Sequence, residues 1–358
     1  MSELPVKKEG QNEEETVNLE GTFRGKYRVL AVFLIACAIF VAAFALTAIF
    51  HSASGDGWLG KHLGGGTETT ATPNTQVPSS SGTVASSENP PVEEIVIPEG
   101  ATPILSKDLS YPELGVGYLH NETPYTPNVV DLMNQSHRLE AVGEEILVLI
   151  VHTHTSESYL MEEKAYFAGE AGDETYSRDH ARSVLVAGEA LAQALNRRGI
   201  PTLHCTVSQD EGGLTGAYRE SAKTVEEYLR AYPSIRLVID LHRDSVMTSD
   251  GAYVRTAASD TREPCAQVMA VVGSDCNGTQ HPNWERNLSL ALQLRSRLNV
   301  DGASVSRPVS LRKASFNQEL SPYSLLLEIG TGANTVEEAR RCALLVGDAL
   351  ADILLGAE

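Results

Sequence analysis

Between residues 145 and 355 the chain alternates short apolar runs with longer amphipathic segments, and this alternation limits the possible folds more than any other feature of the sequence. The apolar runs have strand length, and several lack polar interruptions, as expected for strands buried on both faces. They cover residues 145–151, 200–207, 235–241, 267–272 and 324–329. Helical periodicity marks residues 180–198, 216–231, 284–298 and 335–355. The pattern predicts an α/β fold, with a mostly parallel central sheet and helices on both of its faces.

Histidines and carboxylates follow or end three of these predicted strands. The first strand runs directly into His152 and His154, with Glu157 three residues further on. A later strand runs into His242, and the last strand contains Glu328 near its end. Because ligands of open α/β sheets bind beyond the carboxyl ends of the strands, we expect these side chains to meet at one edge of the sheet.

Imidazole nitrogens together with a carboxylate are the ligands of a catalytic zinc site, in which three protein ligands leave one position for water. Zinc lowers the pKa of that water to about 7, and a nearby Glu takes its proton. His154 and Glu157 form an H-x-x-E pair, a spacing that zinc carboxypeptidases use after a core strand. An unpartnered carboxylate in the apolar strand around Glu328 is energetically costly, so a metal, a cation or a catalytic water is expected beside it.

Four ordered motifs resemble the stage II sporulation protein P (SpoIIP) family of endospore-forming bacteria, over about residues 100–358. They are VLIVHTHTSESY (148–159), VIDLHRDS (238–245), HPNWERNL (281–288) and NQELSPYSLLLEIGTGANTVEEA (317–339). The family is related to zinc-dependent N-acetylmuramoyl-L-alanine amidases, so the resemblance implies their mixed α/β fold. It also implies a peptidoglycan hydrolase that removes stem peptides from glycan strands, and cleaves peptide cross-links, during engulfment. The implied partners are a SpoIID-like lytic transglycosylase and a SpoIIM-like membrane protein.

The resemblance also implies which residues bind the Zn²⁺ and which act on the substrate. His154, or alternatively His152, and His242 take two of the ligand positions, and Glu328 is the catalytic base. The remaining ligand is His180, at the start of the predicted helix where the amidases usually have Glu, or else Glu157.

We further expect three residues to assist the reaction or to contact the substrate. Arg243 either stabilises the oxyanion or binds a stem-peptide carboxylate. His281 and Asn283 are candidate substrate contacts.

Two other functions stay open on the sequence alone. One is a zinc peptidase that acts only on stem-peptide cross-links, which is favoured if Glu157 is the third ligand. The other is a catalytically silent scaffold that binds the cell wall. The muropeptides released by the protein distinguish these possibilities from an amidase.

The segment before the catalytic domain predicts a membrane anchor. Residues 29–50 contain no charged side chain, and a helix of this length spans about 33 Å, enough for the hydrocarbon core of a bilayer. Arg24, Lys26 and Arg28 precede it, so the positive-inside rule places residues 1–28 in the cytoplasm and the rest outside. Residues 51–98 are rich in Gly, Ser, Thr and Pro and are expected to be a flexible linker. The catalytic domain is then residues 99–358.

The formal net charge of −19 argues against a nucleic acid as the main partner, because polyanions are repelled by an acidic surface. Hydrophobic residues make up 42% of the chain, which supplies enough apolar material for a core. Cys205, Cys265, Cys276 and Cys342 lie in the predicted extracytoplasmic part, and the sequence leaves their pairing open.

Overall fold

The computed structural model describes residues 96–110, 119–140, 145–169 and 174–357. All of them belong to one compact unit, Asn89–Glu358. The predicted cytoplasmic tail, the apolar run 29–50 and the linker up to residue 95 lie outside the described residues. Within the described ranges, no helix is both long enough and apolar enough to cross a membrane.

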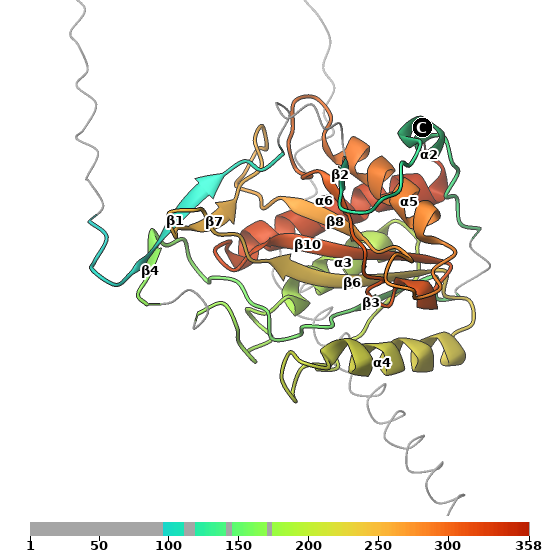
Figure 1. The fold of residues 1–358 in the computed structure, drawn as a ribbon, viewed down its shortest axis with the longest axis horizontal. Coiled ribbons are helices and arrows are strands. Elements are labelled where there is room, and N and C mark those ends of the chain that lie inside the picture. The colour runs from blue at the N-terminus through green and yellow to red at the C-terminus, as the bar shows by residue number, and fades with distance from the viewer. Residues whose placement is uncertain (1–95, 111–118, 141–144, 170–173, 358) are drawn as a thin grey trace, which may run out of the picture. The chain divides into compact units, whose positions relative to one another are not determined.

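A seven-stranded sheet forms the centre of the fold, in the order β2-β9-β8-β10-β6-β3-β5 (Figure 1). The strands are β2 (Leu119–Asn121), β3 (Val148–Val151), β5 (Thr202–His204), β6 (Leu237–Asp244), β8 (Val268–Val272), β9 (Val309–Leu311) and β10 (Tyr323–Thr331). Every neighbouring pair is parallel except β8 and β10, which are antiparallel. The prediction of a mostly parallel sheet is therefore confirmed, with one reversal between its two parallel halves.

Helices cover both faces of this sheet, as the sequence pattern predicts. They are α2 (Val129–Met133), α3 (Leu185–Arg197), α4 (Ala217–Ala231), α5 (Trp284–Leu298) and α6 (Val336–Leu355). Side chains of α3, α5 and α6 share one large core with one face of the strands. On the other face, Val225 of α4 packs with Leu149 and Val238 in a smaller core, and α4 runs apart from the other helices in Figure 1.

The alternation of side chains along β6 decides which face carries the polar residues. Leu237, Ile239 and Leu241 belong to the large core. Val238 belongs to the smaller core under α4, and successive strand residues point to opposite faces, so Asp240 and His242 lie on that same face. The α4 side of the sheet is thus the side on which the predicted zinc ligand His242 is found.

A second, three-stranded sheet was not predicted. Its order is β4-β1-β7, and its strands are β1 (Thr102–Lys107), β4 (Tyr166–Phe167) and β7 (Tyr253–Thr256). Phe167 and Tyr253 pack with Leu160 in a small core of their own. β4 has only two residues, β1 ends in three exposed residues, and β7 contains the charged Arg255. These strands therefore lack the continuous apolar run that identifies most strands of the central sheet.

The helix predicted from residue 180 begins later, at Leu185. Residues 182–184 pair with the segment after β3 instead: Tyr159 N donates to Arg182 O (2.8 Å) and Val184 N donates to Glu157 O (2.8 Å). These backbone bonds use groups that a longer helix would need. Near the other end of the chain, Thr335 and Glu338 form a capping box at the start of α6.

His152 fills a buried space between β3 and α3. Its Nδ1 lies 2.8 Å from Leu241 O and its Nε2 lies 2.8 Å from His204 Nε2. Burial, followed by the neighbouring His204, lowers the pKa of His152 to about 3, so the ring is neutral at physiological pH. A Cβ added to Gly188 of α3 would lie 2.5 Å from Nε2 of both rings, so this glycine makes room for the histidine pair.

We therefore expect Gly188→Ala to destabilise the protein, although Ala is the better helix former. Overpacking of a well-packed interior costs about 1–3 kcal/mol, and the His152 ring is fully buried, with its Nδ1 close to Leu241 O. The measurement is the thermal unfolding midpoint, Tm, with Gly212→Ala as control because a Cβ there meets nothing within 4 Å. Equal Tm values for the two variants would contradict this account of Gly188.

Candidate metal centre

His154, Glu157 and His242 form a cluster at the carboxyl edge of the central sheet, and each offers one potential ligand atom within 4.8 Å of the others. His154 Nδ1 lies 3.2 Å from Glu157 Oε1, and His242 Nδ1 lies 3.2 Å from Glu157 Oε2. The two imidazole rings are perpendicular, with centroids 5.1 Å apart. We refer to these three residues as the metal-ligand cluster.

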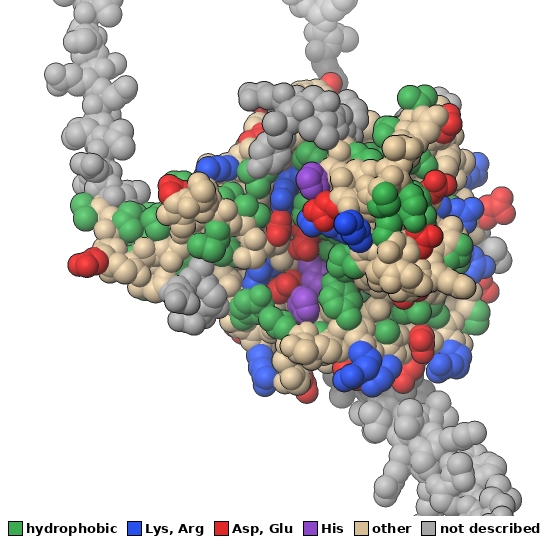
Figure 2. Space-filling view, in the orientation of Figure 1, with side chains coloured by type: hydrophobic (Ala, Val, Ile, Leu, Met, Phe, Trp, Pro, Cys, Tyr) green, Lys and Arg blue, Asp and Glu red, His purple; other side chains and the backbone are tan. Residues whose placement is uncertain are grey.

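The pairing of β3 with β6 brings the cluster together. These strands are parallel neighbours, with Val151 opposite Asp240, so the residues that follow them emerge at the same edge. After β3 the chain turns, and Glu157 N donates to His154 O (3.1 Å), which folds the Glu157 side chain back towards His154. Figure 2 shows histidine side chains beside acidic ones in a hollow of the surface.

The electrostatics of Glu157 suit a metal ligand, because this carboxyl group stays ionised although it is buried. Burial raises its pKa, but His242, His154 and Arg243 together outweigh this and hold the pKa well below its usual range. Arg243 N also donates a hydrogen bond to Oε2 (3.1 Å). A buried anion that is already oriented by a backbone N–H is a suitable ligand for a cation.

His242 is buried between two carboxylates, one at each of its ring nitrogens. Its Nε2 lies 3.1 Å from Asp240 Oδ1, and its Nδ1 faces Glu157. Burial lowers the pKa of His242, but the carboxylates of Asp240 and Glu157 raise it by more, so that the pKa lies well above its usual value. Two carboxylates around one imidazole leave an excess of negative charge that a bound cation balances. The donor set of two imidazoles and one carboxylate fits Zn²⁺.

Glu328 adjoins this cluster on the neighbouring strand, β10. It stands opposite His242 in the register of β10 and β6, on the same face of the sheet. The residue as a whole is partly buried, but its Oε2 is enclosed without a hydrogen-bond partner in the described part of the chain. Burial raises the pKa of Glu328 to about 8. A carboxyl group with a pKa near neutrality beside potential metal ligands has the properties of a general acid or base.

His180, which the sequence favoured as the third ligand, lies outside the cluster. Its side chain is exposed and lines a small hollow with Thr155, Arg178 and Glu211, among others. The late start of α3 explains this position, because His180 belongs to the turn before the helix rather than to its first turn. The structure thus brings Glu157, the alternative ligand, to the other two, and not His180. His152, the alternative to His154, is packed against α3 on the other face of the sheet.

His281 and Asn283, the predicted substrate contacts, lie at the opposite edge of the sheet. The reason is the reversed direction of β8, which places the segment after it near the start of β10. There His281 Nε2 lies 3.2 Å from Asn287 Nδ2, and Asn287 Oδ1 accepts a hydrogen bond from Ser324 N (2.9 Å). His281 is buried, and Asn283 is the N-cap residue of α5.

Arg243 is buried and binds protein groups instead of facing open space. Its Nη2 donates to Thr175 O (2.8 Å), its Nη1 donates to Asp244 O (3.4 Å), and its guanidinium lies 4.7 Å from the centroid of the Tyr176 ring. Together with its backbone hydrogen bond to Glu157, these contacts hold the segment around residue 175 beside the cluster.

Sequence reasoning missed Tyr218, in the first turn of α4. Its ring centroid is 5.7 Å from that of His154 and 6.4 Å from that of His242, and burial raises the pKa of its hydroxyl above the usual range. A tyrosine within a predicted helix gives no signal of a site. Only the packing of α4 against β3 and β6 places it there.

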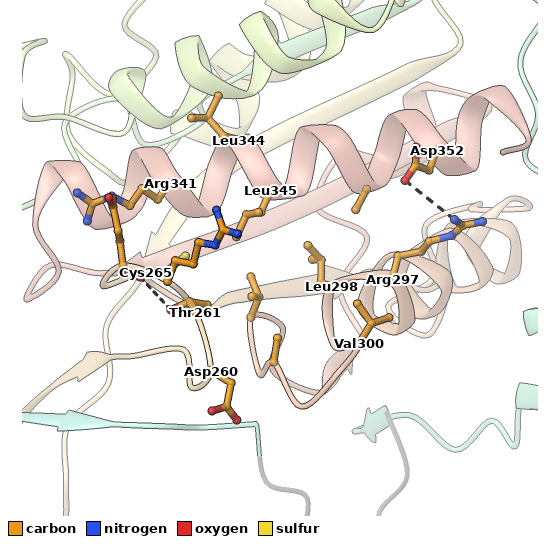
Figure 3. A pocket seen from close by; sticks show the side chains of 15 residues that line it. Asp260, Thr261, Cys265, Arg297, Leu298, Val300, Arg341, Leu344, Leu345 and Asp352 are labelled. Carbon is orange, nitrogen blue, oxygen red and sulfur yellow. Dashed lines mark hydrogen bonds and ion pairs between the residues drawn. The ribbon is translucent and has the colours of Figure 1, made fainter. Parts of the chain in front are cut away.

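A separate pocket of about 620 Å³ lies between α5, α6 and the segment before β8 (Figure 3). Its lining is largely apolar and includes Leu298, Leu344 and Leu345. The pocket contains none of the cluster residues, and it is on the side of the sheet that α5 and α6 cover. It is therefore distinct from the candidate metal centre.

Fold and site together define an α/β protein with a candidate His–Glu–His metal centre at the edge of its central sheet. The sequence profile described as Stage II sporulation protein P (SpoIIP) matches residues 80–354, which is more than half of the chain. The chain belongs to the SpoIIP family.

Similar proteins include one curated relative and several solved structures. Stage II sporulation protein P of Bacillus subtilis (strain 168) is 30% identical over 230 residues, which cover 61% of this chain and 54% of that protein. The match thus spans about half the length of the relative. The N-acetylmuramyl-L-alanine amidase Ami1 from Mycobacterium smegmatis is 15% identical, with a TM-score of 0.38, over 63% of this chain and 100% of that one. The CwlD amidase from Clostridioides difficile, solved in complex with the GerS lipoprotein, is 10% identical, with a TM-score of 0.35, over 60% and 100% of the two chains.

Proposed function

We propose that this protein is a zinc-dependent peptidoglycan hydrolase that removes stem peptides from glycan strands, an N-acetylmuramoyl-L-alanine amidase. The observation that carries the proposal is the convergence of His154, Glu157 and His242 within 4.8 Å, next to Glu328 on the adjoining strand. Membership of the SpoIIP family supports peptidoglycan as the substrate.

His154, Glu157 and His242 would hold the metal. A zinc ion in such a site supplies Lewis-acid chemistry, polarising a carbonyl group and lowering the pKa of a water molecule. Glu328 accepts a proton from the attacking water and returns it to the nitrogen of the leaving amine. Asp240 faces the ring of His242 and is itself held by Thr153, whose N and Oγ1 donate to its two oxygens (2.8 and 2.6 Å).

The setting of the reaction is also part of the proposal. The uncharged run 29–50 anchors the protein in the cell membrane, with the catalytic domain outside, where peptidoglycan is found. Family membership supports a role in sporulation engulfment beside a SpoIID-like lytic transglycosylase and a SpoIIM-like membrane protein.

A second candidate activity is cleavage of the peptide cross-links between stem peptides. The position of Glu157 favours it, because His154 and Glu157 then act as an H-x-x-E ligand pair of the kind that zinc carboxypeptidases use. Both activities use the same cluster and the same base, and they differ in the bond that is presented to it.

Mass spectrometry of the products released from purified sacculi tests the proposal and separates the two activities. An amidase releases free stem peptides, and a cross-link peptidase releases uncrosslinked disaccharide-peptides. We expect free stem peptides, with loss of release after chelation and recovery on addition of Zn²⁺. Release that persists unchanged after complete removal of the metal would overturn the zinc dependence. The absence of any product from the metal-loaded protein would indicate a silent wall-binding scaffold.

A further inference from the structure

Phe316 has a backbone conformation that a bulky residue rarely adopts. It lies between β9 and the 3₁₀ helix η4 (Gln318–Leu320), and its φ of 55° and the φ of 59° of Asn317 are both left-handed. Asn tolerates this region, but for a large side chain such as Phe it is a true outlier. Strained residues of this kind persist only where the surroundings fix them, and they concentrate at ligand-binding sites.

Side-chain hydrogen bonds from the next two residues fix the loop. Asn317 Nδ2 donates to Tyr218 O (2.7 Å) and to Ser221 Oγ (3.1 Å) on α4. Gln318 is buried, with its Nε2 donating to Val271 O (2.9 Å) and its Oε1 accepting from Gly273 N (2.8 Å). The loop that follows Phe316 is thus tied to α4 on one side and to the end of β8 on the other.

The strained backbone holds the Phe316 ring beside Tyr218, next to the metal-ligand cluster. The two ring centroids are 6.0 Å apart and the rings are tilted by 50°. Both residues are partly exposed, and neither belongs to the apolar core clusters of the described residues. Because Tyr218 in turn contacts the His154 and His242 rings, the two aromatic residues form a wall that begins at the cluster and leads away from it.

We propose that this aromatic wall of Tyr218 and Phe316 is a saccharide-binding subsite, on which a sugar ring of the glycan strand stacks. The proposal rests on the proposed amidase function, since the bond cleaved there joins a sugar-borne lactyl group to a peptide. A sugar ring next to that bond must lie close to the cluster. Its C–H faces are apolar and pack against aromatic rings, which are rigid and need little ordering on binding.

The two aromatic rings suit the faces of a sugar ring, which are apolar and carry no charge. The groups that hold the loop in place, Asn317 and Ser221, are a neutral amide and a hydroxyl.

The direct test is binding of a peptide-free tetrasaccharide of alternating N-acetylglucosamine and N-acetylmuramic acid, measured by calorimetry in the Glu328→Gln protein. A single aromatic contact of this kind accounts for about a three- to tenfold change in affinity, so Phe316→Asn and Tyr218→Leu should each weaken binding by this factor. Tyr166→Leu, in β4 of the small sheet, serves as control and should leave the affinity unchanged.

Thermal unfolding of Phe316→Asn separates a binding role from a structural one. Asn accepts a left-handed backbone, so we expect its Tm to equal or exceed that of the wild type while glycan binding weakens. A lower Tm with unchanged glycan binding would show that the ring serves packing alone and would overturn the inference.

The outcomes also distinguish this inference from the proposed function. If the wild type releases no stem peptide from sacculi, the proposed function fails, and the calorimetric experiment still tests the wall. If the wild type is active but both variants keep its KM for glycan strands and its affinity for the tetrasaccharide, the inference alone fails. Equal weakening for a sugar-free stem peptide would assign the wall to the peptide instead and would also overturn it.

Discussion

Glu328→Gln is expected to lower hydrolysis of purified sacculi by about 10²–10⁴-fold, the usual contribution of a general base. The substitution keeps the size of the side chain and removes only its ability to take a proton. Because Glu328 is not one of the three clustered ligands, the zinc content of the variant should equal that of the wild type. Wild-type activity in this variant would rule out Glu328 as the base, and loss of zinc would make it a ligand instead.

Glu328→Gln should also change how the stability of the protein depends on pH, which can be measured without an activity assay. The folded-state pKa of about 8 lies above the ordinary value of 4.5, so the folded protein holds a proton that the unfolded chain releases. This contribution to stability is complete below pH 4.5 and is lost as the pH rises through 8. After chelation of the metal, Tm should therefore fall between pH 5 and 9 more steeply in the wild type than in Glu328→Gln. Parallel curves would argue against the raised pKa.

Glu157→Gln is expected to weaken zinc binding by more than about 100-fold, since even the loss of a group that only orients a ligand costs 10–100-fold. The amide keeps the shape of the carboxylate but lacks the charge that balances the cation. The measurement is the zinc content after dialysis against a competing chelator, together with the release of stem peptides. Both should fall to the level of His242→Ala, which removes an imidazole from the same cluster.

His180→Ala is the matched control for this experiment, because His180 is the competing candidate for the third ligand position. Its side chain is exposed and lies outside the cluster, so zinc content and activity should stay at the wild-type level. Loss of zinc in His180→Ala with retention in Glu157→Gln would reverse our choice of ligand.

Five of the seven strands of the central sheet could be predicted from sequence, because each lies in a largely apolar run of strand length. The other two, β2 and β9, have only three residues each and include polar side chains, so they were not predicted. The run 235–241, for example, is mostly apolar and has strand length. The corresponding strand, β6, lies at residues 237–244. The direction of β8 could not be predicted, because an apolar run reads the same in both orientations. That single reversal moves His281 and Asn283 to the far edge of the sheet.

The candidate site was predictable where it depends on strand ends and was not where it depends on local turns. His154, His242 and Glu328 follow or end buried strands, and parallel pairing brings them together. The choice between His180 and Glu157 depends on backbone bonds such as that from Val184 N to Glu157 O, which delay the helix. The helical spacing of apolar residues in the sequence gives no information about such backbone hydrogen bonds. Tyr218 and Phe316 depend on packing between segments about 100 residues apart.

The position of β10 between β6 and β8 has a consequence for the order of assembly. This strand comes last in the chain, yet it lies at the middle of the sheet and carries Glu328 to the side of His242. Contacts between residues so far apart in sequence form slowly, after the local ones. Until residues 323–331 insert, β6 and β8 have no common partner and the acid–base group is missing. A partly folded chain is therefore unable to carry out the proposed hydrolysis, and activity begins only with the closing of the sheet.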